Sequence, residues 1–140
     1  ECVEQLRKHG VQKVCPLCRA ALPEGPEKLY EDATRLLVAM IRQAGGDERM
    51  QTLTESQQRK MTVVVDMYTS AANQGQADAQ YQLGILYNTG KGVLEDHKKA
   101  AQWYHKAADQ GDAKAQYQLG CMYEHGKGVA QDHKKAVQWT

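Results

Sequence analysis

The residues most able to do chemistry are three cysteines near the start of the chain, Cys2, Cys15 and Cys18. Cys15 and Cys18 are two residues apart, and two thiolates at this spacing form a tight turn that suits tetrahedral zinc. A redox pair is the alternative, but it needs a preceding strand and a helix beginning at the motif. Pro23 and Pro26 follow soon after and argue against such a helix. The spacing therefore predicts zinc ligation, with purely structural cysteines as the remaining alternative.

The segment of about residues 1–22 resembles the C-terminal half of a RING finger, whose ligands hold a pair of zinc ions in a cross-brace. In this resemblance Cys2 matches the sixth ligand, and Cys15 with Cys18 match the last two. Pro16 matches a position that contacts a ubiquitin-conjugating enzyme, and Arg19 matches the basic residue that grips ubiquitin in active members. The earlier ligands are missing from this sequence, so the resemblance implies zinc sites that are incomplete in this chain.

Other kinds of chemistry have no motif in the sequence. There is no grouping of Ser, His and Asp, no carboxylate pair and no phosphate-binding loop, and Gly90-Lys91-Gly92 recurs as a turn. A formal net charge of +1 gives no basic field for nucleic acid. No apolar run approaches the roughly 20 residues of a membrane span. We expect residues 1–140 themselves not to be catalytic and to bind neither nucleic acid nor membrane. The expected location is the cytoplasm.

A repeat occupies the second half of the chain. Residues 75–103 align with residues 111–139 at an offset of 36 without a gap, and 20 of the 29 aligned positions are identical. A fixed period of this size is typical of a solenoid. Because the chain begins with Glu1 and the pattern is still running at Thr140, we expect the sequence to be a piece of a longer protein.

Each copy predicts an antiparallel pair of helices. Apolar residues at helical spacing mark the first helix, Gly90 suits a left-handed C-cap, and Asp96 and Asp112 suit N-caps. Gly84 recurs inside the first helix, where glycine costs roughly 1 kcal/mol against alanine, so we expect a close helix crossing there. The remaining stripe positions are expected to be core or packing residues: Ala79, Leu83, Leu86, Ala100, Trp103, Tyr104, Ala107, Ala108, Cys121 and the tyrosines Tyr81, Tyr87, Tyr117 and Tyr123.

These motifs resemble the Sel-one-like repeat family, relatives of the tetratricopeptide repeats. Its pattern of Ala-x-x-x-Leu-Gly-x-x-Tyr, Gly-x-Gly-Val and Asp-x-x-Lys-Ala-x-x-Trp is matched by residues 79–103 and again by residues 115–139. Members of that family are α-solenoid adaptors that hold other proteins together. The resemblance implies an all-α fold, a right-handed stack of helix pairs, and a scaffold that binds proteins. The alternative, implied by the partial RING finger, is a RING-type ubiquitin ligase whose repeats recruit the substrate.

A degenerate first repeat precedes the two clear copies. Thr54 and Gln57 form a capping box that opens one helix, and Pro26 can stand in the first turn of an earlier helix whose apolar stripe includes Leu36. The predicted organisation is a partial zinc finger at 1–22, a degenerate helical repeat at 26–74, a repeat at 75–110 and a shortened repeat at 111–140. The stripe expected to face the core is Leu29, Ala33, Leu36, Leu37, Met40 and Ile41.

The partner is expected along the first helices of successive repeats, because stacked helix pairs curve and leave an extended groove. Amide side chains both donate and accept hydrogen bonds, so they suit an extended peptide backbone. The lysines that open the second helices, Lys98, Lys99, Lys134 and Lys135, are expected to form a solvated face away from the groove, with a stripe that binds an acidic partner as the alternative. The predicted groove residues are Gln80, Gln82, Asn88, Gln116, Gln118 and Glu124, of which Gln82, Asn88, Gln118 and Glu124 are the expected partner-binding set.

Overall fold

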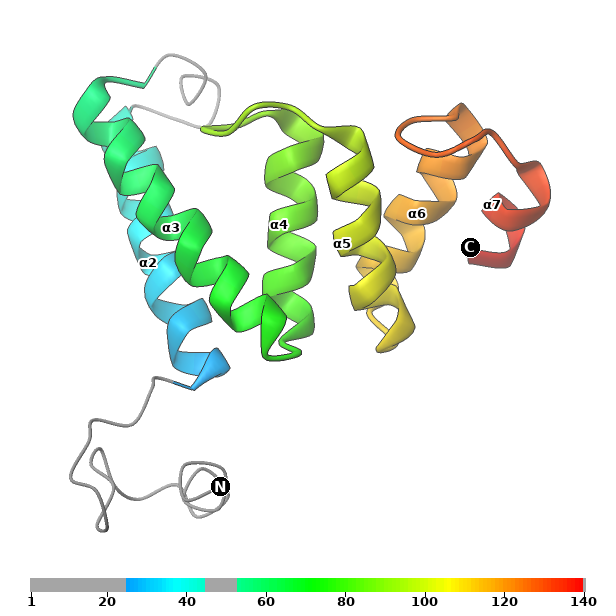
Figure 1. The fold of residues 1–140 in the computed structure, drawn as a ribbon, viewed down its shortest axis with the longest axis horizontal. Coiled ribbons are helices and arrows are strands. Elements are labelled where there is room, and N and C mark those ends of the chain that lie inside the picture. The colour runs from blue at the N-terminus through cyan, green and yellow to red at the C-terminus, as the bar shows by residue number, and fades with distance from the viewer. Residues whose placement is uncertain (1–24, 45–52, 140) are drawn as a thin grey trace, which may run out of the picture.

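The computed structural model describes residues 25–44 and 53–139, which form six helices and no strand. The helices stand side by side as antiparallel pairs that follow one another in chain order (Figure 1), and each packs mainly on the helices before and after it. This arrangement confirms the prediction of an all-α stack of helix pairs. The helices are α2 (Pro26–Ala44), α3 (Glu55–Asn73), α4 (Ala77–Thr89), α5 (His97–Asp109), α6 (Ala113–His125) and α7 (His133–Trp139).

The helix ends form where the sequence predicts them. Thr54 and Gln57 make a reciprocal capping box, in which each side chain accepts a hydrogen bond from the other residue's backbone N–H. Asp96 caps α5 by accepting from the N–H of Lys99, and Asp112 caps α6 in the same way. Gly90 ends α4 in the left-handed conformation, with φ of 66°. These caps satisfy backbone groups that a helix end would otherwise leave unpaired.

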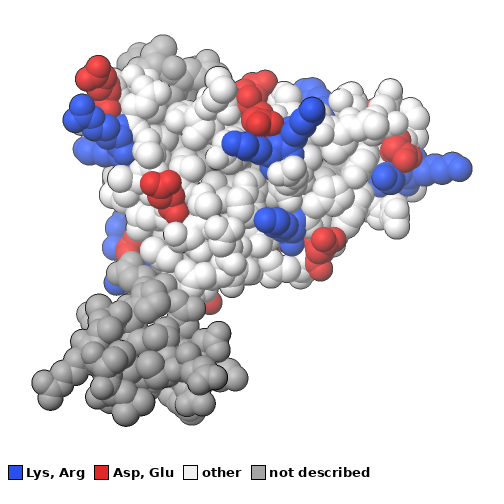
Figure 2. All heavy atoms as spheres, viewed as in Figure 1, with Lys and Arg blue, Asp and Glu red and all other residues white. Residues whose placement is uncertain are grey.

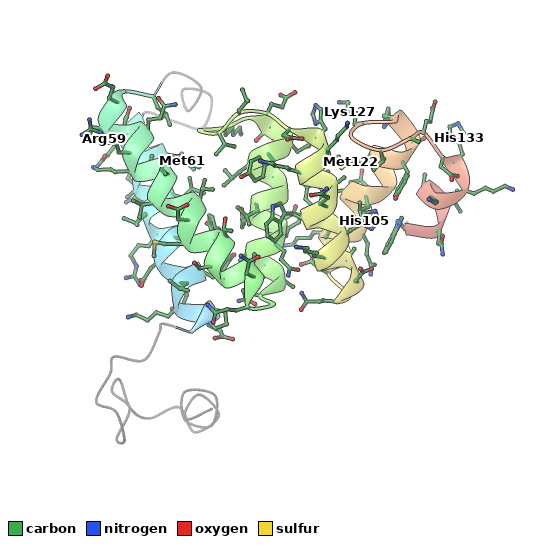
Figure 3. All side chains as sticks on the ribbon, viewed as in Figure 1. Arg59, Met61, His105, Met122, Lys127 and His133 are labelled. Atoms are coloured by element: carbon green, nitrogen blue, oxygen red, sulfur yellow. The ribbon has the colours of Figure 1, made fainter. Side chains whose placement is uncertain are left out.

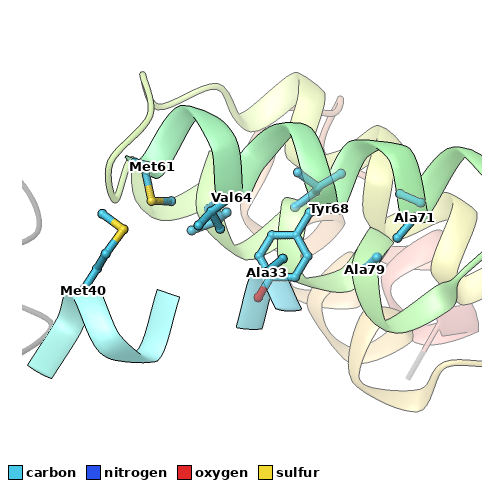
Figure 4. Close-up of a cluster of buried hydrophobic side chains, with 10 residues drawn as sticks. Ala33, Met40, Met61, Val64, Tyr68, Ala71 and Ala79 are labelled. Atoms are coloured by element: carbon cyan, nitrogen blue, oxygen red, sulfur yellow. The ribbon is translucent and has the colours of Figure 1, made fainter. Parts of the chain in front are cut away.

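The first core lies between α2, α3 and α4 (Figure 4). Ala33, Met61, Val64 and Tyr68 are completely buried, and the sulfur-bearing ends of Met40 and Met61 point toward one another. Burial raises the pKa of the Tyr68 hydroxyl, which is hydrogen-bonded to the Thr34 hydroxyl at 2.9 Å. The first helix pair therefore has a packed core of its own, with Tyr68 as its fully buried aromatic residue.

The predicted apolar stripe of α2 is wrong at Leu36. Ala33 and Met40 are buried, but the Leu36 side chain is 42% exposed. Leu36 and Leu37 are adjacent, and neighbouring helical residues point about 100° apart, so both cannot face the same core. Leu37 packs against the core and Leu36 does not.

The second core joins α5, α6 and α7, and α4 packs against it. The close crossing expected at Gly84 lies between α4 and α5. An ideal Cβ on Gly84 would overlap the ring of Tyr104, 2.5 Å from its Cδ1 atom. Tyr104 is only 1% exposed, and burial raises the pKa of its hydroxyl strongly. The missing side chain of Gly84 thus makes room for a large aromatic ring from α5. Ala100, Ala107 and Ala108, which were expected in the core, are all buried, and so is Ala115.

Aromatic side chains join one repeat to the next. His105 of α5 is hydrogen-bonded through Nε2 to the Tyr123 hydroxyl at 2.9 Å. The same imidazole makes edge-on contacts with the rings of Tyr123 and Trp139, at centroid distances of 5.8 and 5.6 Å. Tyr87, predicted to be a packing residue, packs against both cores.

Tyr117 and Cys121 depart from the packing roles expected for them. Tyr117 is 61% exposed, whereas its counterpart Tyr81 packs on Tyr104 at a centroid distance of 5.8 Å. The residue that corresponds to Tyr104 in the next repeat is Thr140, which lies outside the described residues. Cys121 is half-buried, and its thiol near the Tyr117 hydroxyl raises the pKa of that tyrosine. Among the described helices none is long and apolar enough to cross a membrane.

Candidate protein-binding surface

The first helices carry two kinds of glutamine, and the structure separates them. Gln80 is 5% exposed, and its amide nitrogen donates to the carbonyl of Ala72 at the end of α3 at 3.0 Å. Its amide oxygen accepts from Gln110 at 2.8 Å. Gln116, 36 residues later, donates in the same way to the carbonyl of Ala108 at 3.2 Å. The prediction that Gln80 and Gln116 line the groove is therefore wrong, because both amides tie successive helix pairs together.

Gln82 and Gln118 have the other environment. Both are half-buried, and they occupy equivalent positions on α4 and α6. Neither amide makes a hydrogen bond to another described residue. Each amide can donate and accept hydrogen bonds. The two therefore offer the same polar group on successive first helices, 36 residues apart in the sequence.

Asn88 and Glu124 lie at the C-terminal ends of α4 and α6. The Asn88 side-chain oxygen is 3.0 Å from Nδ1 of His97, whose Nε2 is 2.9 Å from a carboxylate oxygen of Glu95. Asn88 is half-buried and helps to hold the start of α5. Glu124 is exposed, and its backbone carbonyl accepts from the Gln131 side chain at 2.8 Å.

The comparisons with known proteins agree with this architecture. The Sel1 repeat family matches residues 77–112 and 113–140. Residues 77–140 are Sel1 repeats. Sel1 repeat proteins act as protein–protein interaction scaffolds. Among curated proteins no relative matches the chain.

Solved structures show the same fold. A protective antigen of uropathogenic Escherichia coli with an SLR fold is 33% identical with a TM-score of 0.56, over 84% of this chain and 24% of its own. A Sel1 repeat protein of Oxalobacter formigenes is 27% identical with a TM-score of 0.54, over 79% of this chain and 52% of its own. Cysteine-rich protein B of Helicobacter pylori, at 23% identity and a TM-score of 0.54 over 79% of this chain and 84% of its own, shares the fold. The chain spans less than two thirds of the first two proteins.

The lysines that open the second helices of the Sel1 repeats are exposed, as predicted. Two of them also contact aromatic rings. The Lys99 ammonium lies 5.4 Å from the ring centre of Tyr87, and Lys135 lies 5.4 Å from that of Tyr123. A cation over an exposed aromatic face contributes about 0.5–1 kcal/mol, so these lysines support the helix pair as well as solubility.

The residues predicted to bind zinc and the ubiquitin machinery lie outside the described residues. These are Cys2, Cys15 and Cys18 as metal ligands and Pro16 and Arg19 as contacts. Within residues 25–44 and 53–139, no group of three His, Cys, Asp or Glu side chains could hold a metal ion. Zinc binding therefore remains a prediction from the cysteine spacing.

Proposed function

We propose that this chain is a scaffold that binds a segment of a partner protein along the first helices of its Sel1 repeats, α4 and α6. The observation that supports this most directly is the contrast between Gln80 and Gln82. The amide of Gln80 is buried in an internal hydrogen bond, whereas the amide of Gln82, two residues away, is partly exposed and makes none to a described residue. Gln118 repeats that arrangement one layer on.

An extended peptide suits this surface because its backbone carries alternating donors and acceptors that amides can match. A repeat of amides on stacked helices gives several such contacts in a row. Glu124 adds an acidic group near one end, and the remaining amide atoms of Asn88 lie near the end of α4.

The test is a pull-down that identifies a partner, followed by two multiple variants. One replaces Gln82, Asn88, Gln118 and Glu124 with Ala, and the other reverses the charge of Lys98, Lys99, Lys134 and Lys135. We expect the first variant to lose the partner in physiological salt and the second to retain it. Retention by the first and loss by the second would place the binding surface on the second helices.

We propose a second function, that of a RING-type ubiquitin ligase whose repeats recruit the substrate, on the spacing of Cys2, Cys15 and Cys18. Zinc would be held by these thiolates together with ligands that this sequence lacks, so residues 1–140 alone should bind less than one equivalent of tight zinc. A full equivalent in metal analysis would contradict this. The thiolate ligands favour a reducing compartment, so we propose a cytoplasmic location.

Arg19→Ala tests the ligase directly in the full-length protein. Arg19 follows the last ligand, so its loss should lower ubiquitin discharge from a conjugating enzyme while zinc stays bound. Pro16→Ala should weaken binding of the conjugating enzyme. A full-length protein that never stimulates discharge would leave the scaffold as the function.

A further inference from the structure

The first helix pair is longer than those of the Sel1 repeats and carries a groove of its own. α2 and α3 have 19 residues each, against 13 in α4, α5 and α6. In Figure 1 the start of α3 lies far from α4, at the outer edge of the stack. A hollow of about 340 Å³ there is lined by Leu36, Ala39, Met40 and Gln43 of α2 and by Lys60 and Val63 of α3.

This groove exposes aliphatic side chains at positions where the Sel1 repeats carry polar ones. Leu36 of α2 is 42% exposed and Val63 of α3 is 50% exposed. Val38, also on α2, is 46% exposed and lines a neighbouring hollow. The residues that correspond to Val63 in the two Sel1 repeats are Lys99 and Lys135, at offsets of 36 and 72. The first layer therefore exposes aliphatic side chains at a place where the other layers present a cation.

Leu36 is also an aliphatic residue at a position where the Sel1 repeat carries a polar one. When α2 is aligned with α4 on their buried residues, Ala33 falls on Ala79 and Met40 falls on Leu86. Leu36 then falls on Gln82, an amide of the candidate surface. Exposed aliphatic residues that cluster in a hollow indicate an interaction site, whereas isolated ones are ordinary.

Basic side chains border the groove. On the other side of Ala39, a second hollow of about 490 Å³ is lined in part by Glu31, Arg35 and Arg42. Of the residues that line the two hollows, Arg35, Arg42 and Lys60 are basic and Glu31 is acidic. Arg35 pairs with Asp32 at 3.5 Å. Figure 2 shows basic side chains beside acidic ones over the start of α3, where Arg59, labelled in Figure 3, and Glu55 are both exposed.

We propose that this α2–α3 groove binds an amphipathic helix of a partner protein, with acidic residues flanking the apolar stripe of that helix. A trough between two helices accepts a third helix through apolar anchors at positions i, i+3, i+4 and i+7. Lys60 in the groove and Arg42 in the neighbouring hollow complement acidic flanks, which raises the association rate and sets the orientation. A symmetric contact with a second copy of this chain would instead bring two copies of this basic border together.

The experiment uses the full chain and synthetic helical peptides of about 18 residues, long enough for five turns. One peptide carries a leucine stripe flanked by glutamates, and a second replaces those glutamates with lysines. Fluorescence anisotropy measures binding to the wild type, to Leu36→Gln with Val63→Lys, and to Arg42→Glu with Lys60→Glu. The first variant installs residues that the Sel1 repeats themselves carry, so it should fold. Leu94→Gln is the matched control, because Leu94 is 90% exposed on the loop after α4.

We expect the acidic peptide to bind the wild type and the Leu94→Gln control equally. The apolar variant should raise its Kd about tenfold or more, and the charge-reversal variant should exchange the preference between the two peptides. Melting temperatures should stay within a few degrees of wild type. Failure of the acidic peptide to bind, or equal binding of both peptides by the wild type, would overturn the proposal. A concentration-dependent dimer that the apolar variant abolishes would assign the groove to a second copy and overturn it as well.

Discussion

Gly128 and His97 are in contact across the junction between two successive repeats. Gly128 has φ of 72°, and a Cβ at that position would overlap the backbone carbonyl of His97. Gly92 and Met61, each 36 residues earlier, repeat the relationship, with the ideal Cβ of Gly92 2.6 Å from the Met61 Cγ atom. The second glycine of each Gly-Lys-Gly turn thus lets the turn lie against the second helix of the preceding pair.

Gly128→Ala should destabilise the protein more than Gly126→Ala, and urea unfolding measures both. The two glycines share a turn and have φ of 72° and 67°, so the left-handed strain of about 1–2 kcal/mol is common to both. Only Gly128 faces a backbone carbonyl, which cannot rotate away; the nearest atom to Gly126 is a side-chain Cβ at 3.2 Å. Gly92→Ala should be intermediate, because the Met61 side chain can move. Equal losses at positions 126 and 128 would show that docking of the turn contributes nothing.

Gly84→Ala should lower the free energy of unfolding by about 1–3 kcal/mol, and Gly84→Leu by more, because each overpacks the Tyr104 ring. A double-mutant cycle with Tyr104→Ala separates this clash from helix propensity. In the Tyr104→Ala background Gly84→Ala should cost less, or even stabilise, since alanine favours a helix more than glycine does. Thermal melts that put Gly84→Leu at or above wild type would refute the close crossing.

Gln80→Leu should destabilise the protein by about 1–3 kcal/mol, because it leaves the Ala72 carbonyl and the Gln110 amide without their partner. Gln82→Ala, two residues on, is the control and should change stability by less than about 0.5 kcal/mol. Chemical denaturation measures both variants. A neutral Gln80→Leu would mean that water replaces the lost hydrogen bonds.

Thr54→Ala should cost about 0.5–2 kcal/mol through loss of the capping box at the start of α3. Thr62→Ala on the same helix is the control. The Thr62 hydroxyl only donates back to the Gln58 carbonyl at 3.0 Å, and alanine has the higher helix propensity. Thr62→Ala should therefore be neutral or stabilising in thermal melts. A Thr54→Ala melt that matches wild type would show that the α3 end frays without cost.

Local features were predictable from the sequence because each depends on residues close in the chain. The 36-residue period predicted the helix pairs, and the cap residues Thr54, Asp96 and Asp112 and the turn glycine Gly90 marked the helix ends. Gly84 was also readable, since a glycine repeated inside a helix is costly unless something packs closely against it. The Sel1 match to residues 77–140 agrees with the repeat that the 36-residue period predicted.

The candidate surface was only partly predictable. The sequence placed Gln80 and Gln82 together as polar residues of one helix, and nothing in their local pattern separates them. What separates them is the end of α3, whose carbonyl at Ala72 lies beside Gln80 and not beside Gln82. The acceptor that buries one amide belongs to another helix, so only the packed structure could decide it.

The sequence by itself determined the kind of elements, their order and their ends, because helix period, caps and glycine turns act within a few residues. The tertiary structure decided which of two adjacent residues meets a neighbour. It packed Leu37 and exposed Leu36, and it exposed Tyr117 while packing its counterpart Tyr81 on Tyr104. The physical reason is that burial depends on the atoms opposite a side chain, and in a solenoid those atoms belong to the next helix or the next layer.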